Sequence, residues 1–138
     1  MLAGQKFVAP MGEVGEILQT PRVTKVPGVR NWMLGVSNIR GRLVPILDLA
    51  GLLTVPSKAS WRTRRVLVIG QGDQQNGLLV DAVLGMQQFP SHLMSNQMYV
   101  EANYAPYVRG GFERDGANWP IFSFTDLIQA DEFLQVAV

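Results

Sequence analysis

The side chains that could carry out chemistry in this chain are few and far apart. It contains a single histidine, His92, and no cysteine. A metal site or a nucleophile–base pair needs several such groups close together, and His92 has no second histidine or cysteine to join it. The eleven carboxylates are spread along the sequence rather than grouped. The residue types therefore predict neither catalysis nor a metal or cofactor site.

Three carboxylates have positions that indicate structural roles. Asp48 and Asp126 stand where the N-caps of two short helices would fall, and a carboxylate at an N-cap accepts hydrogen bonds from backbone amides. Asp81 directly follows the apolar run GLLV. We interpret Asp81 as a strand-end residue that accepts hydrogen bonds from the backbone or from an arginine, rather than as a catalytic group.

Sequence patterns for binding phosphate or nucleic acid are weak. Gly70 and Gly72 lack the spacing and the following helix of a dinucleotide fingerprint. The segment WRTRR (61–65) is a basic cluster with an aromatic residue, a combination found in proteins that bind single strands. It leads into an apolar strand, however, where solvated charges that protect the strand end are the better interpretation. The net charge of +1 also argues against a surface that neutralises many phosphates.

The composition indicates a globular protein with a buried core. Of the 138 residues, 47% are hydrophobic and 17% are charged, which fits one domain or two very small units sharing a core. No apolar run reaches the roughly 18 to 20 residues that a membrane span requires. The beginning, MLAGQKFVAP, lacks the features of a signal peptide. We therefore expect a soluble cytoplasmic protein.

Strand patterns outnumber helix patterns. We predict three β-hairpins, namely 34–49 turning at the dipeptide Gly41-Arg42, 64–89 turning at QGDQQN, and 107–124 turning at DGAN. Short helices are predicted at 48–53 and 124–128, with one further turn within 10–18. The polar segment 54–64 is predicted to be a linker, and 96–107 an irregular connection.

Two of the hairpins share a pattern at a spacing of 75 residues. The matches fall in one order along both hairpins: Trp32 with Tyr107, Gly35 with Gly110, Gly41 with Gly116, Pro45 with Pro120, Ile46 with Ile121, Leu49 with Phe124, and Leu52 with Leu127. A weaker parallel joins KFVAPMGEVGEI to NGLLVDAVLGM. The pattern predicts two similar β units, each too small to bury a good core alone and therefore packed on the other.

Arg40 stands at the tip of the first hairpin, and two interpretations remain open. It is either an exposed turn charge that contributes little to stability, or the partner of Glu16, which follows the preceding strand and bend. A charge-assisted pair would hold the segment EVGEIL against the hairpin and keep a shared groove rigid. The second hairpin has Asp115 at the equivalent position, so the repeated fold does not require an arginine.

The motifs of the chain, taken in order, resemble the CheW domain of bacterial chemosensory arrays. The markers are EIL (16–18), GVSNIRG (35–41), VPILDL (44–49) and GLLVDAV (77–83), and the resemblance spans residues 7 to 128. GRLVPILDL, GMQQFP and the ending FLQVAV further resemble members of this family that act in type IV pilus twitching motility.

The resemblance implies a mainly β fold of two small SH3-like five-stranded barrels, packed together with short helices. It implies one CheW-like domain over 1–138, with approximately 1–56 plus the chain end as subdomain 1 and 62–123 as subdomain 2. It also implies a non-catalytic adaptor without cofactors. Such an adaptor joins the cytoplasmic tip of a methyl-accepting chemoreceptor to the regulatory domain of a CheA-type histidine kinase, in polar membrane-associated arrays. Neither nucleic acid nor direct insertion into the membrane is expected.

The resemblance also implies a set of protein-binding residues. Arg40 matches the arginine of the family's N-x-R-G turn, and Glu16 matches the acid of its E-I motif. In relatives these positions resemble a coupled pair beside an apolar receptor groove, whereas kinase contacts use the barrel flanks. Val14, Val36 and Asn38 are further candidates for lining that groove.

The N-terminus departs from the family pattern. Members usually have another strand before the segment matching GQKFVAP, so the first strand of the first barrel is expected to be missing here. An unpaired strand edge can pair with a second chain. We therefore expect a tendency to dimerise through that edge.

A generic small-barrel module that binds peptides or oligonucleotides is the alternative, because small barrels host such ligands. The two hypotheses differ in their response to salt. Affinity for a nucleic acid would fall steeply as salt rises, whereas binding in an apolar receptor groove would be far less sensitive.

Overall fold

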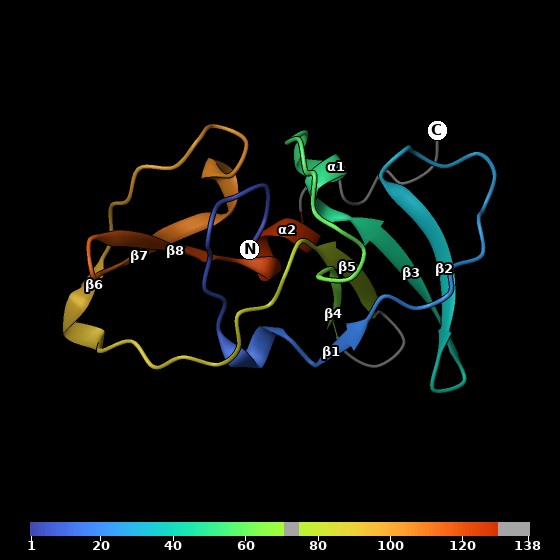
Figure 1. Cartoon of the computed structure of the whole chain (residues 1–138), viewed down its shortest axis with the longest axis horizontal. Coiled ribbons are helices and arrows are strands. Elements are labelled where there is room, and N and C mark those ends of the chain that lie inside the picture. The colour runs from blue at the N-terminus through green and yellow to red at the C-terminus, as the bar shows by residue number, and fades with distance from the viewer. Residues whose placement is uncertain (71–74, 130–138) are drawn as a thin grey trace.

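Two β sheets lie side by side in the computed structural model, which describes residues 1–70 and 75–129 (Figure 1). The larger sheet has the order β1-β4-β5-β3-β2, with β1 (Glu16–Gln19), β2 (Met33–Ile39), β3 (Arg42–Asp48), β4 (Arg65–Ile69) and β5 (Asn76–Val80). The smaller sheet has the order β6-β7-β8, with β6 (Met94–Ser95), β7 (Val108–Arg114) and β8 (Ala117–Phe122). The predicted mainly β class is therefore confirmed.

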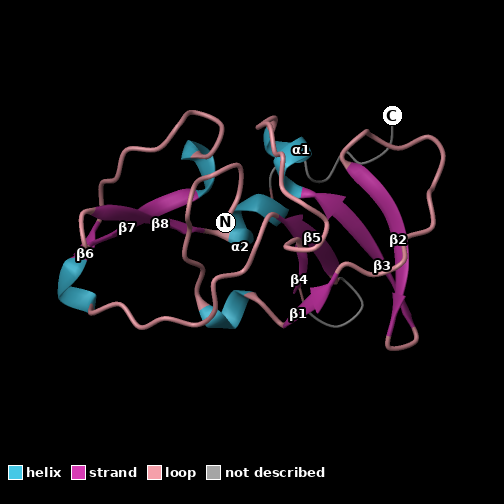
Figure 2. Cartoon of the chain, viewed as in Figure 1, coloured by secondary structure: helices cyan, strands magenta, loops and turns pink. Residues whose placement is uncertain are grey.

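Helices in the described part of the chain are short and lie at strand ends or in loops (Figure 2). They are α1 (Leu49–Leu53), α2 (Phe124–Ile128) and the 3-10 turns η1 (Met11–Glu13), η2 (Ser91–Leu93) and η3 (Ala105–Tyr107). Both α helices and the turn within 10–18 lie where the sequence predicts them. No helix among residues 1–70 and 75–129 is long and apolar enough to cross a bilayer.

The sheets do not follow the expected division of the chain into 1–56 and 62–123. β4 and β5 pair with β1 and β3 of the larger sheet, although they lie beyond the linker. Val8, expected in the first unit, pairs with Ile121 of β8 in the other sheet. Strand pairing thus interleaves the two halves of the sequence, because long-range ladders join segments that no local pattern connects. The expected contribution of the chain end to subdomain 1 lies outside the described residues.

The repeated pattern corresponds to a repeated arrangement of backbone. β2–β3 and β7–β8 are both antiparallel hairpins with a register shift near Gly35 and Gly110. Ile46 of the first hairpin pairs in parallel with Gly77, and Ile121 of the second pairs in parallel with Val8. The segments KFVAPMGEVGEI and NGLLVDAVLGM therefore lie at equivalent positions beside the two hairpins, which explains their weak sequence similarity.

The two units share one core. β3, β4 and β5 bury side chains on both faces, which explains their continuous apolar runs. One face forms a cluster of its own, made of Val44, Ile46, Val66, Val68 and Leu79. The other face supplies Leu47, Ile69 and Leu78 to a larger cluster that also contains Phe122 and Leu127 from the second unit. The expectation that the units pack on each other is confirmed.

Three local features differ from the sequence predictions. The smaller sheet has three strands within the described residues instead of five, although Val8 extends its pairing. The first hairpin turns at Arg40-Gly41 rather than Gly41-Arg42, since Ile39 pairs with Arg42. The hairpin predicted over 64–89 is paired only as far as Val80, because β3 ends opposite Leu79 and β4 begins opposite Val80.

Neither of the two aspartates predicted as N-caps uses its side chain to cap a helix. Asp48 occupies the N-cap position of α1, but its side chain makes no capping hydrogen bond. The N-cap of α2 is Ser123, whose Oγ accepts a hydrogen bond from the amide of Asp126 at 3.2 Å. Asp126 instead forms an ion pair with Arg109, in which the guanidinium of Arg109 donates a hydrogen bond to the carboxylate of Asp126. This hydrogen bond is the main cause that raises the pKa of Arg109, and the negative charge of Asp126 is the second.

A distant carboxylate completes the cap of α2. Glu13 Oε1 accepts hydrogen bonds from the amides of Phe124 at 2.7 Å and Thr125 at 3.2 Å. The first amides of a helix have no partner within the helix, so Glu13 satisfies two of them from a segment more than a hundred residues away. This contact fixes η1 and the start of β1 against the second unit.

We predict that Glu13→Ala lowers the free energy of unfolding by about 1–2 kcal/mol, the usual range for loss of a helix cap. Chemical denaturation followed by circular dichroism would measure the change. Glu113→Ala is the control, because Glu113 is an exposed carboxylate on β7. Equal stability of the two variants would show that Glu13 does not stabilise α2.

Candidate functional site

Arg40 and Glu16 form an ion pair, which is one of the two interpretations that the sequence left open. Arg40 Nη2 lies 2.7 Å from Glu16 Oε1, and the two side chains are 78% and 25% exposed, respectively. Glu16 begins β1, and Arg40 is the first residue of the turn between β2 and β3. The structure therefore confirms that Arg40 is paired with Glu16.

The pair joins the two ends of the larger sheet. β1 and β2 are the outermost strands in the order β1-β4-β5-β3-β2. In a flat sheet their axes would lie about 19 Å apart, four strand spacings of about 4.8 Å each. A 2.7 Å contact between Glu16 on β1 and the residue after β2 thus requires the sheet to curl until its ends approach. The ion pair closes this curl at one rim.

The backbone at Arg40 is unfavourable for its residue type. Arg40 has φ 55° and Gly41 has φ 81°, the left-handed pair of a type I′ hairpin turn. Asn, Asp and Gly tolerate this conformation, whereas most other residues lose about 1–2 kcal/mol in it. The equivalent turn contains Asp115 and Gly116, with φ 53° and 77°, which suit the geometry better. Arg40 therefore occupies a position where the turn itself disfavours an arginine.

Asn38 and Val36 lie on the same hairpin as Arg40. Asn38 Oδ1 accepts a hydrogen bond from the amide of Gly41 at 2.9 Å, so this side chain closes the turn that presents Arg40. The sequence had suggested only a groove position for it. Val36 is half-buried and points to the same side of β2 as Asn38, because alternate residues of a strand share a face.

Val14 lies on the Glu16 side of the pair. It ends η1 just before β1 and packs partly against the shared core. The next residue, Gly15, donates its amide to the carbonyl of Val68 at 2.8 Å, which places Val14 and Glu16 firmly beside β4. The structure thus brings together Glu16, Arg40 and Asn38 by direct contacts or a shared turn, and leaves Val14 and Val36 as flanking apolar residues.

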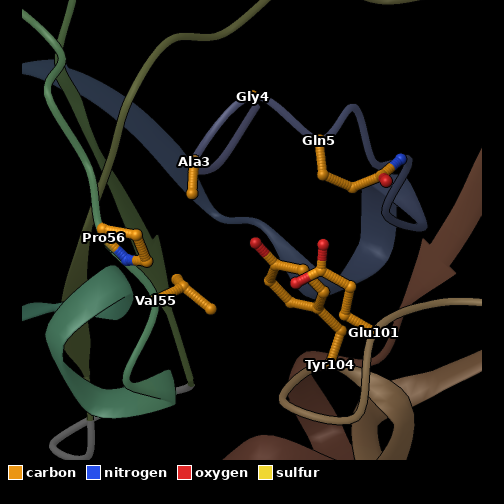
Figure 3. A pocket seen from close by; sticks show the side chains of 7 residues that line it. All are labelled: Ala3, Gly4, Gln5, Val55, Pro56, Glu101 and Tyr104. Carbon is orange, nitrogen blue, oxygen red and sulfur yellow. The ribbon is translucent and has the colours of Figure 1, made fainter.

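A cavity of about 320 Å³ lies away from this site, between the N-terminal turn and the linker (Figure 3). Its lining residues are Ala3, Gly4, Gln5, Val55, Pro56, Glu101 and Tyr104. Burial is the main cause that raises the pKa of Tyr104, and the charges of Glu101 and Asp81 add to it. The Tyr104 hydroxyl therefore stays protonated as a donor toward the carbonyl of Leu2, 3.4 Å away. None of the five predicted site residues lines this cavity.

Asp81 has the structural role predicted for a strand-end acid. It is 8% exposed, and its Oδ2 accepts a hydrogen bond from the amide of Ala3 at 2.7 Å. Its Oδ1 accepts another from the hydroxyl of Ser57 at 2.6 Å. Asp81 therefore ties the N-terminal turn and the linker to the end of β5. These two partners could not be predicted from the sequence, because neither belongs to a motif.

The comparisons with known proteins show the family to which the chain belongs. A family model described as a CheW-like domain matches residues 1–132. The chain belongs to the CheW-like family. Protein PilI of Pseudomonas aeruginosa is 48% identical over 138 residues, covering 99% of this chain and 77% of that protein. Chemotaxis protein CheW of Bacillus subtilis is 31% identical over 81 residues, which cover 59% of this chain and 52% of that protein.

The CheW-like fold is also found in a similar solved structure. The scaffolding protein TtCheW from Thermoanaerobacter tengcongensis has a TM-score of 0.81 and 21% sequence identity, covering 96% of this chain and 90% of that chain. The motif-based resemblance to CheW domains is confirmed by these matches. The finer resemblance to one member of the family is confirmed as sequence similarity to PilI.

Proposed function

We propose that this chain is a non-catalytic adaptor that couples a methyl-accepting chemoreceptor to a CheA-type histidine kinase, in an array that controls type IV pilus twitching motility. Membership of the CheW-like family supports the adaptor role, and the solved relative is described as a scaffolding protein. The similarity to PilI supports the pilus pathway. The proposal places the protein in the cytoplasm, at polar membrane-associated arrays.

In this proposal the cytoplasmic tip of the receptor binds beside the Arg40–Glu16 pair, with Val14, Val36 and Asn38 around it. The regulatory domain of the kinase binds the flanks of the two units. The observation that carries the proposal is the arginine at a strained, exposed turn position. A residue that the turn disfavours, and whose exposed ion pair stabilises the fold by about 1 kcal/mol at most, is better explained by binding than by stability.

Two variants test this site in pull-down assays with a receptor cytoplasmic fragment and with the kinase regulatory domain. Glu16→Ala is expected to weaken receptor binding about tenfold while changing the free energy of unfolding by less than about 1 kcal/mol. Val36→Asp is expected to weaken it further, because a carboxylate would lose its water in an apolar contact. Equal recovery of receptor and kinase by both variants, with normal twitching, would reject the site.

We also propose that two copies can associate through an unpaired strand edge. Within the described residues β1 ends the larger sheet, and Ile17 on this strand is 51% exposed. Open edges of this kind add strands from other chains. Light scattering over increasing concentration should show dimers, and Ile17→Lys should suppress them, whereas Leu43→Lys, at a 74% exposed site on β3, should not. A strictly monomeric protein at every concentration would contradict this proposal.

A further inference from the structure

Trp61 differs from the other two tryptophans in its exposure. Trp119 is 8% exposed and Trp32 packs against the shared core, but Trp61 is 61% exposed. A tryptophan side chain is large and mainly apolar, so a folded chain normally covers most of it. Tryptophan is also strongly enriched among the residues that contribute most to protein–protein binding. The exposure of Trp61 therefore points to a surface that a partner covers.

The turn that carries Trp61 is held by its own hydrogen bonds. Ser60 Oγ accepts from the amide of Arg62 at 3.2 Å, and Thr63 Oγ1 donates to the carbonyl of Ser60 at 3.0 Å. Arg64 Nε donates to the carbonyl of Ala59 at 3.2 Å, which spans the turn. A surface that is already ordered loses less conformational entropy when it binds, so this turn is preorganised for contact.

The turn is anchored to the interior through Asp81. The Ser57 hydroxyl that donates to Asp81 also accepts from Arg64 Nη2 at 3.4 Å. The Arg64 guanidinium in turn lies 5.1 Å from the centre of the Trp61 ring, within the range of a cation–π contact. A chain of contacts thus runs from a buried carboxylate to the exposed indole, and Ser57 and Asp81 act as positioning residues.

The segment that carries Trp61 has a positive net charge. Residues 54–70 contain four basic side chains and no carboxylate. Arg64 and Arg65 are occupied as donors to nearby backbone carbonyls. Lys58 and Arg62 are exposed, and no carboxylate within the described ranges 1–70 and 75–129 pairs with them. A partner that covers Trp61 must therefore bring negative charge to these two cations.

We propose that Trp61, Lys58 and Arg62 form a docking surface for an acidic, partly apolar face of a partner protein. Two free cations are too few for a polybasic membrane contact, which uses about four to eight, or for a nucleic acid groove. A tryptophan with flanking cations suits a compact protein contact instead. The surface precedes the first residue of β4, Arg65, which pairs with Gln19. Glu16 pairs with Val68, near the opposite end of β4. It is thus separate from the Arg40–Glu16 site and goes beyond the proposed function.

The proposal is tested in cells by replacing Trp61 with photoreactive benzoylphenylalanine in the full chain. Irradiation should cross-link one protein through a peptide that contains Asp or Glu. Arg62→Glu in the same chain should lower the yield about tenfold, and changing the partner's carboxylate to lysine should restore it. Lys25→Glu is the matched control, because Lys25 is an exposed cation elsewhere and the charge change is the same.

Affinity for the identified partner, measured with purified proteins, supplies the second readout. Trp61→Ala should weaken binding at least about tenfold, whereas Trp61→Phe should keep most of it. Cross-links only to lipid or nucleic acid, no cross-link above that of the same group placed at Lys25, or an unchanged affinity in Trp61→Ala would each overturn the proposal. Arg40→Asn should leave the Trp61 cross-link intact, so failure of the receptor site and failure of this surface are distinguishable.

Discussion

Replacement of Gly35 or Gly110 by alanine is expected to lower the free energy of unfolding by about 3–5 kcal/mol, the largest effect of any single substitution proposed for this chain. A Cβ at Gly35 would lie 2.1 Å from the carbonyl oxygen of Thr24, and one at Gly110 would lie 2.1 Å from that of Ser95. Both obstacles are backbone atoms of the neighbouring edge segment, so they cannot move aside as a flexible side chain would. The φ angles of 145° and 74° add strain for any residue with a Cβ.

The physical reason for this effect is the close approach of a third segment to each hairpin. Thr24 exchanges two backbone hydrogen bonds with Val36, at 2.8 and 2.9 Å, and Ser95 pairs with Gly111. An added methyl group would push these segments off the hairpin edges. Denaturant titration of Gly35→Ala and Gly110→Ala would measure the loss.

Gly116→Ala is the matched control for these two variants. Gly116 also has a positive φ, 77°, but nothing lies within 4 Å of its added Cβ. Its replacement should cost only the backbone strain of about 1–2 kcal/mol. If all three alanine variants lost the same stability, close approach would not be the reason for the glycines at 35 and 110.

Arg40→Asn is expected to separate binding from folding. Asparagine tolerates the left-handed turn conformation that Arg40 adopts at φ 55°, so the turn should be relieved by about 1 kcal/mol. The lost exposed ion pair with Glu16 offsets this gain by about 0.2–1 kcal/mol. The free energy of unfolding should therefore stay equal or rise slightly, while the affinity for a receptor cytoplasmic fragment should fall about tenfold or more.

Thermal unfolding and receptor binding, measured on the same preparations, check this prediction. Asp115→Asn, at the equivalent turn of the second hairpin, should change neither quantity. A variant Arg40→Asn that binds receptor as well as the parent chain would remove the evidence for a binding role of the arginine. A marked loss of stability would show instead that closure of the larger sheet depends on the ion pair.

Several features followed from the sequence because local chemistry decides them. The positions of α1 and α2, the Asp115-Gly116 turn and the apolar strands β3 to β5 all reflect neighbouring residue types. The match between Gly35 and Gly110 was also readable, because the same steric need recurs in both hairpins. The pair of Glu16 and Arg40 was one of two open interpretations of their positions in the sequence, and the family resemblance favoured it.

Other predictions failed where distant segments decide the outcome. Strand pairing crosses the expected boundary near residues 56–62, since β4 and β5 join the first hairpin and Val8 joins the second. Asp126 was predicted to cap α2, but Ser123 and the distant Glu13 satisfy those amides. The first turn was predicted one residue too late, at Gly41-Arg42. The reason is that a positive φ is expected for a glycine such as Gly41 but not for an arginine such as Arg40.

The sequence by itself determined that this chain is a mainly β member of the CheW-like family, with two related hairpins and few groups able to do chemistry. Strand alternation, turn residues and ordered motifs are properties of short segments, so they can be recognised before the fold is known. Only the tertiary structure decided which segments cover which hairpin, what Asp81 and Glu13 hold in place, and that the basic linker presents Trp61 on an anchored turn. These are contacts between residues far apart in the chain, and the free energy that selects them comes from shared burial and hydrogen bonding across both units.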